Sequence, residues 1–348
     1  MFDKAAFAAH ESVHHVFDAL TGLRVIIAIH STARGPAAGG CRMWTYANSD
    51  EALTDALRLS EGMSYKNAMA DLPLGGGKAV ILGNPRTDKT PELFRALGRA
   101  IDRLNGAYWS AEDVGVSTED MAFAAEETRY VAGLPGRSGD PSPVTARGVY
   151  LGIRAAALRA FGTDDLANRH VAVQGVGHVG AHVCRFLAGA GARLTIADVN
   201  AQAAAVLARE TGARLVAPAE IYDAPADIFS PNALGAIINP DTLERLKVKV
   251  VAGGANNQLA TPDMGEGLMA RGILYAPDYV INGGGIINVA AEIAGAYDPA
   301  WVEAKLQRLM ATLGEVMDQA LREGRAVNRV ADVIARRRIG RETGQPQA

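Results

Sequence analysis

The sequence predicts an α/β protein of two domains, and three observations support this prediction. The chain has 348 residues, enough for two domains of ordinary size with separate apolar cores. Residues 133–143 concentrate glycine and proline, which excludes a helix or a central strand and indicates a domain boundary and hinge. After this boundary, short apolar runs alternate with helical patterns, as in βαβ units with a mainly parallel sheet.

In the first half, apolar runs and capping residues predict the order of the elements. A β-rich apolar run lies between Gly22 and the Gly35-Pro36 turn and predicts a strand over 23–30. Helices are expected where Ser49, Thr90 and Ser117 precede acidic residues and apolar positions at helical spacing. Their expected ranges are 49–66, 90–104 and from 117 onward, and Asp113 falls on the loop before the last of them.

In the second half, strands and helices alternate. A helix is expected over about 145–161, another from 180, and a helical tail from 299 to about 338. The expected strands cover 170–174, 193–197, 228–229, 248–252 and 273–275. This order predicts a doubly wound α/β domain.

The composition does not favour a nucleic-acid or membrane partner. Apolar residues make up 49% of the chain, charged residues 21%, and the net charge is -3. Such a balance lacks a basic patch for polyanions, and no apolar run approaches the length of a membrane span. Charged residues between Asp3 and Glu11 argue against a secretory signal. Two cysteines, Cys41 and Cys184, are too few for a disulfide framework, so we expect a cytoplasmic protein.

One segment of the first half places a lysine directly after three glycines, in Leu74-Gly75-Gly76-Gly77-Lys78. We expect a glycine-rich turn at the start of a strand over 79–82. A P-loop is excluded because Leu72 and Ala79 stand where it needs glycine and a hydroxyl residue. Lys78 is then either a chemically active lysine or a plain surface lysine, and the spacing alone favours the second.

The second half contains a complete G-x-G-x-x-G between a strand and a helix, formed by Gly175, Val176, Gly177, His178, Val179 and Gly180. Asp198 ends the next strand, 23 residues after Gly175, where a carboxylate can bind both ribose hydroxyls of a dinucleotide. The pattern predicts a Rossmann-type domain that holds a pyrophosphate at a helix N-terminus. Because Asp198 would repel a 2′-phosphate, we expect NAD rather than NADP. The alternative is that the glycines serve only a tight turn.

Several segments, taken together, resemble the amino-acid dehydrogenases that act on glutamate, leucine, phenylalanine or valine. The similar segments are 35–43, 63–67, 73–78, 111–115, 141–145, 251–259 and 276–282. The leucine-specific members are the most similar and the phenylalanine-specific members come next. The resemblance implies a substrate and oligomerisation domain over 1–132, a cleft, and a Rossmann-type NAD domain over 133–319. A helix over about 320–348 could pack back on the first domain.

The resemblance also implies roles for individual residues. Lys66 would bind the substrate carboxylate, Lys78 would be the catalytic lysine, and Asp113 would exchange protons with the amino nitrogen. Gly39 and Gly40 would approach the substrate through their backbone, and Asn256 would contact it. An apolar pocket would be lined by Ala38, Ala111, Ile286 and Val289. Besides the glycine motif and Asp198, the cofactor would contact Ser142, Thr145, Ala233 and Asn257.

Some of these residues have simpler interpretations. Lys66, near a helix C-terminus, could only complement the helix dipole, and Asp113 could cap the following helix, although Ser117 is better placed. His178 and His182 share a helix face but have no evident third ligand, so no metal site is expected. Asn232 stands where relatives usually carry cysteine, a position to which the resemblance assigns no catalytic role.

These inferences predict reversible, NAD-dependent oxidative deamination of leucine, valine or isoleucine to the 2-oxo acid and ammonia. Lys78, neutral through desolvation and the nearby charge of Lys66, would activate the attacking water. Phenylalanine is the alternative substrate, because Ala38 replaces a usual leucine, whereas Ile286 is bulkier than the usual valine. A non-catalytic NAD-binding protein is the more remote alternative. Relatives imply a homo-oligomer, from dimer to octamer.

Overall fold

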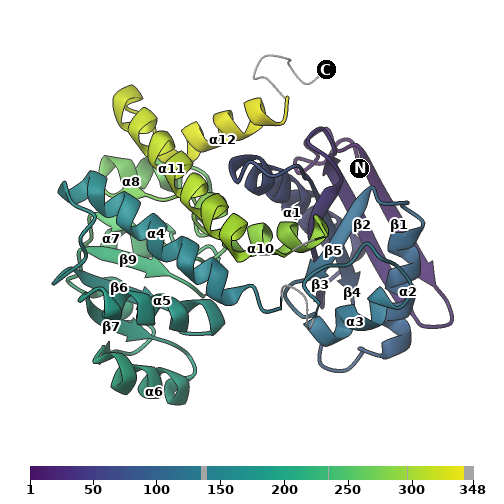
Figure 1. The fold of residues 1–348 in the computed structure, drawn as a ribbon, viewed down its shortest axis with the longest axis horizontal. Coiled ribbons are helices and arrows are strands. Elements are labelled where there is room, and N and C mark those ends of the chain that lie inside the picture. The colour runs from purple at the N-terminus through teal and green to yellow at the C-terminus, as the bar shows by residue number, and fades with distance from the viewer. Residues whose placement is uncertain (135–138, 234, 296, 341–348) are drawn as a thin grey trace. The chain divides into compact units, whose positions relative to one another are not determined.

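The computed structural model describes residues 1–134, 139–233, 235–295 and 297–340, which form two compact units (Figure 1). The first unit comprises 1–141, 286–302 and the chain from 335, and the second comprises 142–285 and 303–334. The domain boundaries inferred from the sequence, near 132 and 319, stay a prediction. Parts of two expected segments lie outside the described residues, namely 135–138 of the glycine- and proline-rich boundary and 341–348 of the C-terminal helix.

The first unit is built on a mixed sheet. Within the described residues its five strands lie in the order β1-β2-β4-β3-β5. β4 pairs parallel with β3 and antiparallel with β2, so β4 is the central strand. β3 also pairs parallel with β5, and β1 pairs antiparallel with β2. The strands are β1 (Ser12–Asp18), β2 (Leu23–Ser31), β3 (Ala37–Trp44), β4 (Gly75–Leu82) and β5 (Tyr108–Glu112).

Helices cover both faces of this sheet. α1 (Ser49–Met69) packs on one face against alternate residues of β2 and β4, including Ile26, Ala28 and Val80. α2 (Pro91–Asp102) and α3 (Thr118–Ala125) lie on the other face, over Val25, Ile27 and their neighbours (Figure 1). Because both faces are covered, β2 reads in the sequence as a continuous apolar run.

The second unit contains a parallel sheet of the dinucleotide-binding type. In the described part of the chain, its six strands follow the order β11-β10-β9-β6-β7-β8, and all neighbouring strands pair in parallel. Numbered along the chain, this is the order 6-5-4-1-2-3 of a Rossmann fold, with its switch point between β6 and β9. The strands are β6 (His170–Gln174), β7 (Arg193–Ala197), β8 (Arg214–Leu215), β9 (Ile228–Pro231), β10 (Val250–Val251) and β11 (Leu274–Tyr275).

The helices of the second unit complete its layers. An apolar cluster joins β9 and β10 to residues of the 3-10 helix η1 and of α8, among them Ile221 and Leu268. On α4, the missing side chain of Gly152 makes room for Ile281 and Met310. The helices that lie wholly in this unit are α4 (Ser142–Phe161), α5 (His178–Gly189), α6 (Ala201–Thr211), η1 (Ile221–Asp223), α7 (Pro240–Arg245), α8 (Met264–Ala270) and α9 (Asp278–Ile281). Three further helices are divided between the units: α10 (Gly284–Ile293) belongs to the first unit from residue 286, α11 (Pro299–Glu323) to the second from residue 303, and α12 (Val327–Arg338) to the first from residue 335.

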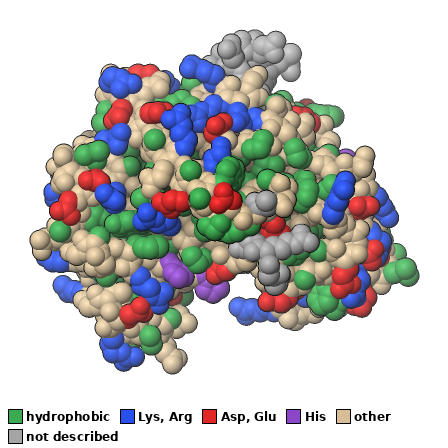
Figure 2. All heavy atoms as spheres, viewed as in Figure 1, with side chains coloured by type: hydrophobic (Ala, Val, Ile, Leu, Met, Phe, Trp, Pro, Cys, Tyr) green, Lys and Arg blue, Asp and Glu red, His purple; other side chains and the backbone are tan. Residues whose placement is uncertain are grey.

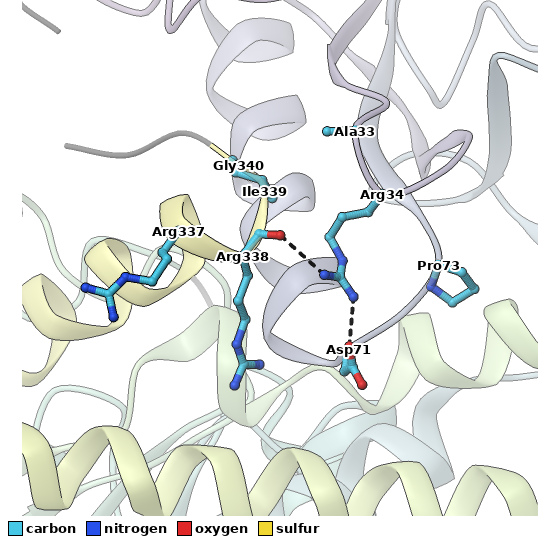
Figure 3. Close-up of a pocket in the computed structure, with 8 residues that line it drawn as sticks. All are labelled: Ala33, Arg34, Asp71, Pro73, Arg337, Arg338, Ile339 and Gly340. Atoms are coloured by element: carbon cyan, nitrogen blue, oxygen red, sulfur yellow. Dashed lines mark hydrogen bonds and ion pairs between the residues drawn. The ribbon is translucent and has the colours of Figure 1, made fainter. Parts of the chain in front are cut away.

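The end of α12 packs against the C-terminus of α1 within the first unit. Arg338 donates from Nη1 to the carbonyls of Ala68 and Met69, at 3.2 and 3.0 Å. Arg34 donates to the carbonyl of Arg338 and to Asp71, and these residues line a pocket of about 610 Å³ (Figure 3). A cation on the last carbonyls of a helix stabilises it through the helix dipole. The end of α12 therefore stabilises the last turn of α1.

Most expected elements are confirmed, with differences at their ends. Asn48, not Ser49, caps α1, because its side chain accepts from the backbone N–H groups of Asp50 and Glu51. Ser117 caps α3, with Asp120 completing a capping box. The helical tail is interrupted after Glu323, where Gly324 has a φ of 60° that favours glycine. β1 and β3 were not expected from the sequence.

The surface carries charges of both signs. Figure 2 shows Lys and Arg side chains interspersed with Asp and Glu over the visible face, in line with the net charge of -3. Among the described residues, no helix is both long and apolar enough to cross a membrane.

Candidate functional site

Lys78 lies inside a central strand, not on a turn. β4 begins at Gly75, and Lys78 pairs with Ala28 of β2. Ala79 and Ile81 face α2 and α3, so Lys78 and Val80 point to the opposite face, which α1 covers. Only 5% of Lys78 is exposed. The expected glycine-rich turn and the plain surface lysine are therefore both wrong, and Lys78 is a buried charged residue that needs a partner.

The three glycines before Lys78 make room for other parts of the first unit. A Cβ atom at Gly75 would lie 1.9 Å from the carbonyl oxygen of Ser31. At Gly76 it would lie 2.1 Å from the backbone nitrogen of Ser64 in α1, and at Gly77 2.7 Å from the ring of Tyr108. Only glycine allows such approaches. The run is extended because these contacts and the strand pairing outweigh its turn propensity.

Asp113 is the partner of Lys78. The Nζ atom of Lys78 lies 2.7 Å from Oδ2 of Asp113, directly after β5. The Nε atom of Arg42, on β3, lies 3.2 Å from the same oxygen. Burial raises the pKa of the Asp113 carboxyl, but Lys78 and Arg42 lower it more, to about 2. Asp113 is therefore ionised and shared by two cations.

A second carboxylate holds Arg42 from the other side. The Nη1 atom of Arg42 lies 3.0 Å from Oδ2 of Asp55 on α1, and the hydroxyl of Tyr46 donates to the same oxygen at 2.5 Å. The sequence reasoning missed Arg42, Asp55 and Tyr46. Arg42 falls inside the similar segment 35–43, which was the available signal, whereas no spacing relates it to Asp55.

Gly39 and Gly40 lie on β3, next to the Lys78–Asp113 pair. A Cβ atom at Gly40 would lie 2.7 Å from Cβ of Asp113, and one at Gly39 would lie 1.9 Å from the carbonyl oxygen of Gly77. The Tyr108 hydroxyl donates to the carbonyl of Gly39 at 2.9 Å. A side chain at either glycine would displace the strand or Asp113.

Lys66 and Asn67 lie in the last turn of α1, the helix that covers the Lys78 face of the sheet. The side-chain nitrogen of Asn67 donates to the carbonyls of Gly75 and Ala38, which ties this turn to β4 and β3. Lys66 is half-buried. Its position agrees both with substrate binding and with the simpler role at the helix dipole.

Three of the four residues expected to line the substrate pocket come together in the first unit. Ala111 and Val289 belong to one apolar cluster, on which Ile286 packs together with Trp109. The cluster joins β5 to α10. Ala38 is buried in β3 but lies outside this cluster. The first unit therefore contains an apolar wall beginning two residues before Asp113.

In the second unit the three motif glycines serve different purposes. Gly175 has a φ of 85°, and a Cβ there would lie 2.6 Å from Cβ of Ala233. A Cβ at Gly180 would lie 2.0 Å from the carbonyl oxygen of Gly175, so this glycine allows close contact of helix and strand. A Cβ at Gly177 would have no described atom within 4 Å. Gly177 and His178 are exposed at the N-terminus of α5, which fits a dinucleotide pyrophosphate.

Asp198 follows β7 and faces the glycine motif. Its Oδ2 atom accepts from the backbone nitrogen of Val176 at 2.7 Å, and its Oδ1 atom accepts from that of Asn200 at 2.7 Å. Each oxygen keeps further lone pairs for a ribose hydroxyl. Val179, the remaining motif residue, is half-buried on α5.

The other expected contacts in the second unit lie at three places, on α4, after β9 (Ala233) and after β10. Ser142 and Thr145 occupy the first turn of α4, where Thr145 packs close to Gly284. Asn256 and Asn257 are exposed after β10, and Asn256 accepts from the Asn282 side chain at 2.7 Å. Asn232, at the end of β9, accepts from the backbone nitrogen of Gly254. Its role is to connect two loops at the edge of the sheet.

Comparisons with known proteins extend over both units. The family model for the Glu/Leu/Phe/Val dehydrogenase dimerisation domain matches residues 9–130, and the model for Glutamate/Leucine/Phenylalanine/Valine dehydrogenase matches residues 195–343. A leucine dehydrogenase of Thermoactinomyces intermedius is 52% identical over 342 residues, 97% of this chain and 93% of that protein. A phenylalanine dehydrogenase of Bacillus thermotolerans is 46% identical, over 97% and 90% of the two chains. The crystal structure of L-tryptophan dehydrogenase from Nostoc punctiforme is similar with a TM-score of 0.84 and 42% identity, over 95% and 96% of the chains.

Proposed function

The chain belongs to the Glu/Leu/Phe/Val dehydrogenase family, and from this premise we propose that it catalyses the reversible, NAD-dependent oxidative deamination of leucine, valine and isoleucine. The predicted family resemblance, the two-domain α/β fold and the class of amino-acid dehydrogenase are confirmed by the comparisons. The observation that carries the proposed chemistry is the buried Lys78–Asp113 ion pair. It lies in the same unit as the apolar wall of Ala111 and Val289.

Membership of a dehydrogenase family implies a nicotinamide cofactor, and we propose NAD. The open space at Gly177 and the carboxylate of Asp198 support this choice. A carboxylate at the end of the second strand accepts hydrogen bonds from the ribose hydroxyls and repels a 2′-phosphate. We assign the pyrophosphate to residues 175–180 and the nicotinamide end to Ser142, Thr145, Ala233 and Asn257.

The residues of the first unit have complementary tasks in this reaction. Lys66 pairs with the substrate carboxylate. A nicotinamide held by the second unit would supply the acceptor for the hydride that the amino acid loses. Lys78, as the neutral amine, then takes a proton from the water that attacks the substrate imine, and the ammonium so formed stabilises the oxygen of the 2-oxo acid as that oxygen forms. Asp113 exchanges protons with the leaving ammonia.

The proposed substrates are branched-chain amino acids because the wall of the first unit is apolar. Ala111, Ile286 and Val289 supply no cation for a second carboxylate, which disfavours glutamate. Phenylalanine is the second candidate, since Ala38 is small and the phenylalanine dehydrogenase is 46% identical. A single methylene changes selectivity by only about 1 to 3 kcal/mol, so these substrates must be ranked by measurement.

The decisive experiment is NADH formation with a panel of L-amino acids at alkaline pH, for the protein and for Lys78→Ala. We expect activity with leucine, valine and isoleucine, and a loss of roughly 10³-fold in kcat for Lys78→Ala with NAD affinity unchanged. Lys89→Ala is the matched control, because Lys89 also pairs with an aspartate, Asp120, in the same unit. Absence of NADH with every amino acid would refute the proposal.

We propose two further properties of the protein, its assembly and its location. We propose a homo-oligomer assembled through the first unit, because residues 9–130 match a dimerisation domain. Light scattering that gives the mass of a single chain would exclude it. We also propose a cytoplasmic location. The two thiols, at Cys41 and Cys184, are buried and unpaired, in keeping with a reducing compartment.

A further inference from the structure

We infer that Arg42 is a positioning residue for this reaction, which holds the carboxylate of Asp113 in place while Lys78 leaves it to act on the substrate. The inference rests on the proposed function for its chemistry and on the ion pairs of the first unit for its geometry. Asp55 and Tyr46 take part in the same network: Asp55 forms an ion pair with Arg42 on the side away from Asp113, and Tyr46 donates a hydrogen bond to Asp55.

The geometry connects the groups in a chain of alternating charge. Oδ2 of Asp113 lies 2.7 Å from Lys78 and 3.2 Å from Nε of Arg42. Arg42 reaches Asp55 through a different nitrogen, Nη1, at 3.0 Å. A guanidinium can bridge two carboxylates in this way because its donors point in fixed, different directions. An ammonium has no such fork.

The two cations on Asp113 are not equally anchored. In the described part of the chain, Arg42 forms ion pairs with two carboxylates and Lys78 with one. Tyr46 adds a hydrogen bond to Asp55, which steadies the carboxylate behind Arg42. Lys78 can therefore turn toward a substrate oxygen by giving up one contact, whereas Arg42 would have to give up two.

The different anchoring of Lys78 and Arg42 affects how well Asp113 accepts and gives up protons. With both cations in contact the pKa of Asp113 is about 2, too low for an effective proton acceptor. When Lys78 moves to the substrate, one positive charge leaves the carboxylate, which then becomes a stronger base. Arg42 keeps the carboxylate oriented during that exchange, so that its distance to the amino nitrogen is preserved.

The other titratable groups around the pair do not supply this effect. Cys41 on β3 and Tyr108 on β5 lie in the core on the other face of the sheet, and burial raises the pKa of each, so both stay neutral. Asp55 acts through Arg42. Lys66 belongs to the same helix as Asp55, three turns further on, and its proposed partner is the substrate carboxylate. Asp120 is paired with Lys89. Arg42 is therefore the permanent cation of the pair.

Kinetics of three variants test this role, because their charges have opposite effects. Arg42→Met removes a cation from the pair, so we expect kcat to fall about 100-fold and the acid limb of the kcat/KM profile to move up by about one pH unit. Asp55→Asn removes a negative charge but keeps an acceptor oxygen, so the limb should move down by a few tenths of a unit. Arg42→Lys should keep the limb near its original pH and lose roughly tenfold in kcat, since an ammonium cannot bridge both carboxylates.

The matched control is Arg95→Met. Arg95 also bridges two carboxylates of the first unit, Glu126 and Glu92, away from Lys78, so its kcat and pH profile should not change. The KM for leucine should change less than about threefold in all Arg42 variants, because Arg42 does not touch the substrate. An unchanged kcat and acid limb in Arg42→Met would overturn the inference. A loss of kcat in Arg42→Met that a smaller folded fraction of the protein explains alone would overturn it as well.

A titration without substrate separates this inference from the proposed function. The carboxyl ¹³C signal of Asp113, assigned by its loss in Asp113→Asn, should titrate about one pH unit higher in Arg42→Met than in the unaltered protein. If the protein fails to oxidise amino acids, the proposed function is wrong and the titration still decides whether Arg42 controls Asp113. An unchanged titration overturns the inference.

Discussion

Two glycine-rich segments of this protein look alike in the sequence and have opposite purposes in the structure. In β4 of the first unit, the missing side chains of Gly75, Gly76 and Gly77 are replaced by other protein atoms within 3 Å. In the motif of the second unit, Gly177 has no described atom within 4 Å of an added Cβ. A glycine thus indicates close approach, and only its neighbours show whether a protein segment or a ligand approaches.

The largest expected effect tests the packed glycines. Gly76→Ala should lower the free energy of unfolding by about 3 kcal/mol or more, because its Cβ would lie 2.1 Å from the backbone of α1 at Ser64. Urea unfolding measures this. The control is Gly62→Ala on α1, which meets no atom within 4 Å and should stabilise the protein by roughly 0.5 to 1 kcal/mol. Equal stabilities of the two variants would contradict the packing argument.

The second effect concerns the carboxylate of Asp113, which pairs with Lys78, the residue that follows the packed glycines. The pKa of Asp113 is about 2 in the folded protein, against about 3.9 when unfolded. Its ionisation therefore stabilises the fold by about 2 kcal/mol above pH 4, and this contribution is lost as pH falls toward 2. Asp113→Asn should be less stable by that amount at neutral pH. The difference should shrink as pH falls below about 4, and urea unfolding that gives a constant difference would refute the assignment.

The third effect tests the open glycine. Gly177→Ala should leave the free energy of unfolding within about 0.5 kcal/mol of the original value, because its φ is -66° and the space is free. The added methyl should weaken NAD binding by about tenfold, since it enters the space assigned to the pyrophosphate. Calorimetric titration with NAD measures this. A destabilised variant with unchanged NAD affinity would make Gly177 a packed glycine like Gly76.

The smallest effect concerns the hydrogen bonds between Arg338 and α1, the helix that packs on Gly76. Arg338→Ala removes two hydrogen bonds to the last carbonyls of α1 and should cost about 1 kcal/mol. Hydrogen exchange should accelerate at the last turn of α1, around Lys66, and remain unchanged in β6. Uniform acceleration would mean that the contact supports the whole chain rather than this turn.

The sequence predicted the second unit better than the first. Strands β6 and β7 match their expected ranges because each is a short apolar run bounded by a glycine or a charged residue. In the first unit, β3 was not expected, since Gly39 and Gly40 weaken its apolar pattern. The strand forms because β4 and β5 pair with it on both sides. Such non-local pairing has no signature in a local window.

The candidate site shows the same division. Lys78 and Asp113 could be named from the family resemblance, and the structure adds that they touch. Arg42 lies in a segment that resembles the family, but its relation to Asp55 and Tyr46 could not be found, because it depends on the registry of β3 against α1. Residues that act through other residues leave a weaker sequence signal than those that contact a ligand.

The division of the first unit along the chain has a consequence for protein synthesis. Parts of this unit emerge from the ribosome long after β5. They are Ile286 and Val289 of its apolar wall, and Arg338, which binds the last turn of α1. A nascent chain released at residue 141 would have the sheet but neither of these supports. The first unit to be translated is therefore the last to be completed, and gene fragments cut at residue 141 should yield a less stable protein than the full chain.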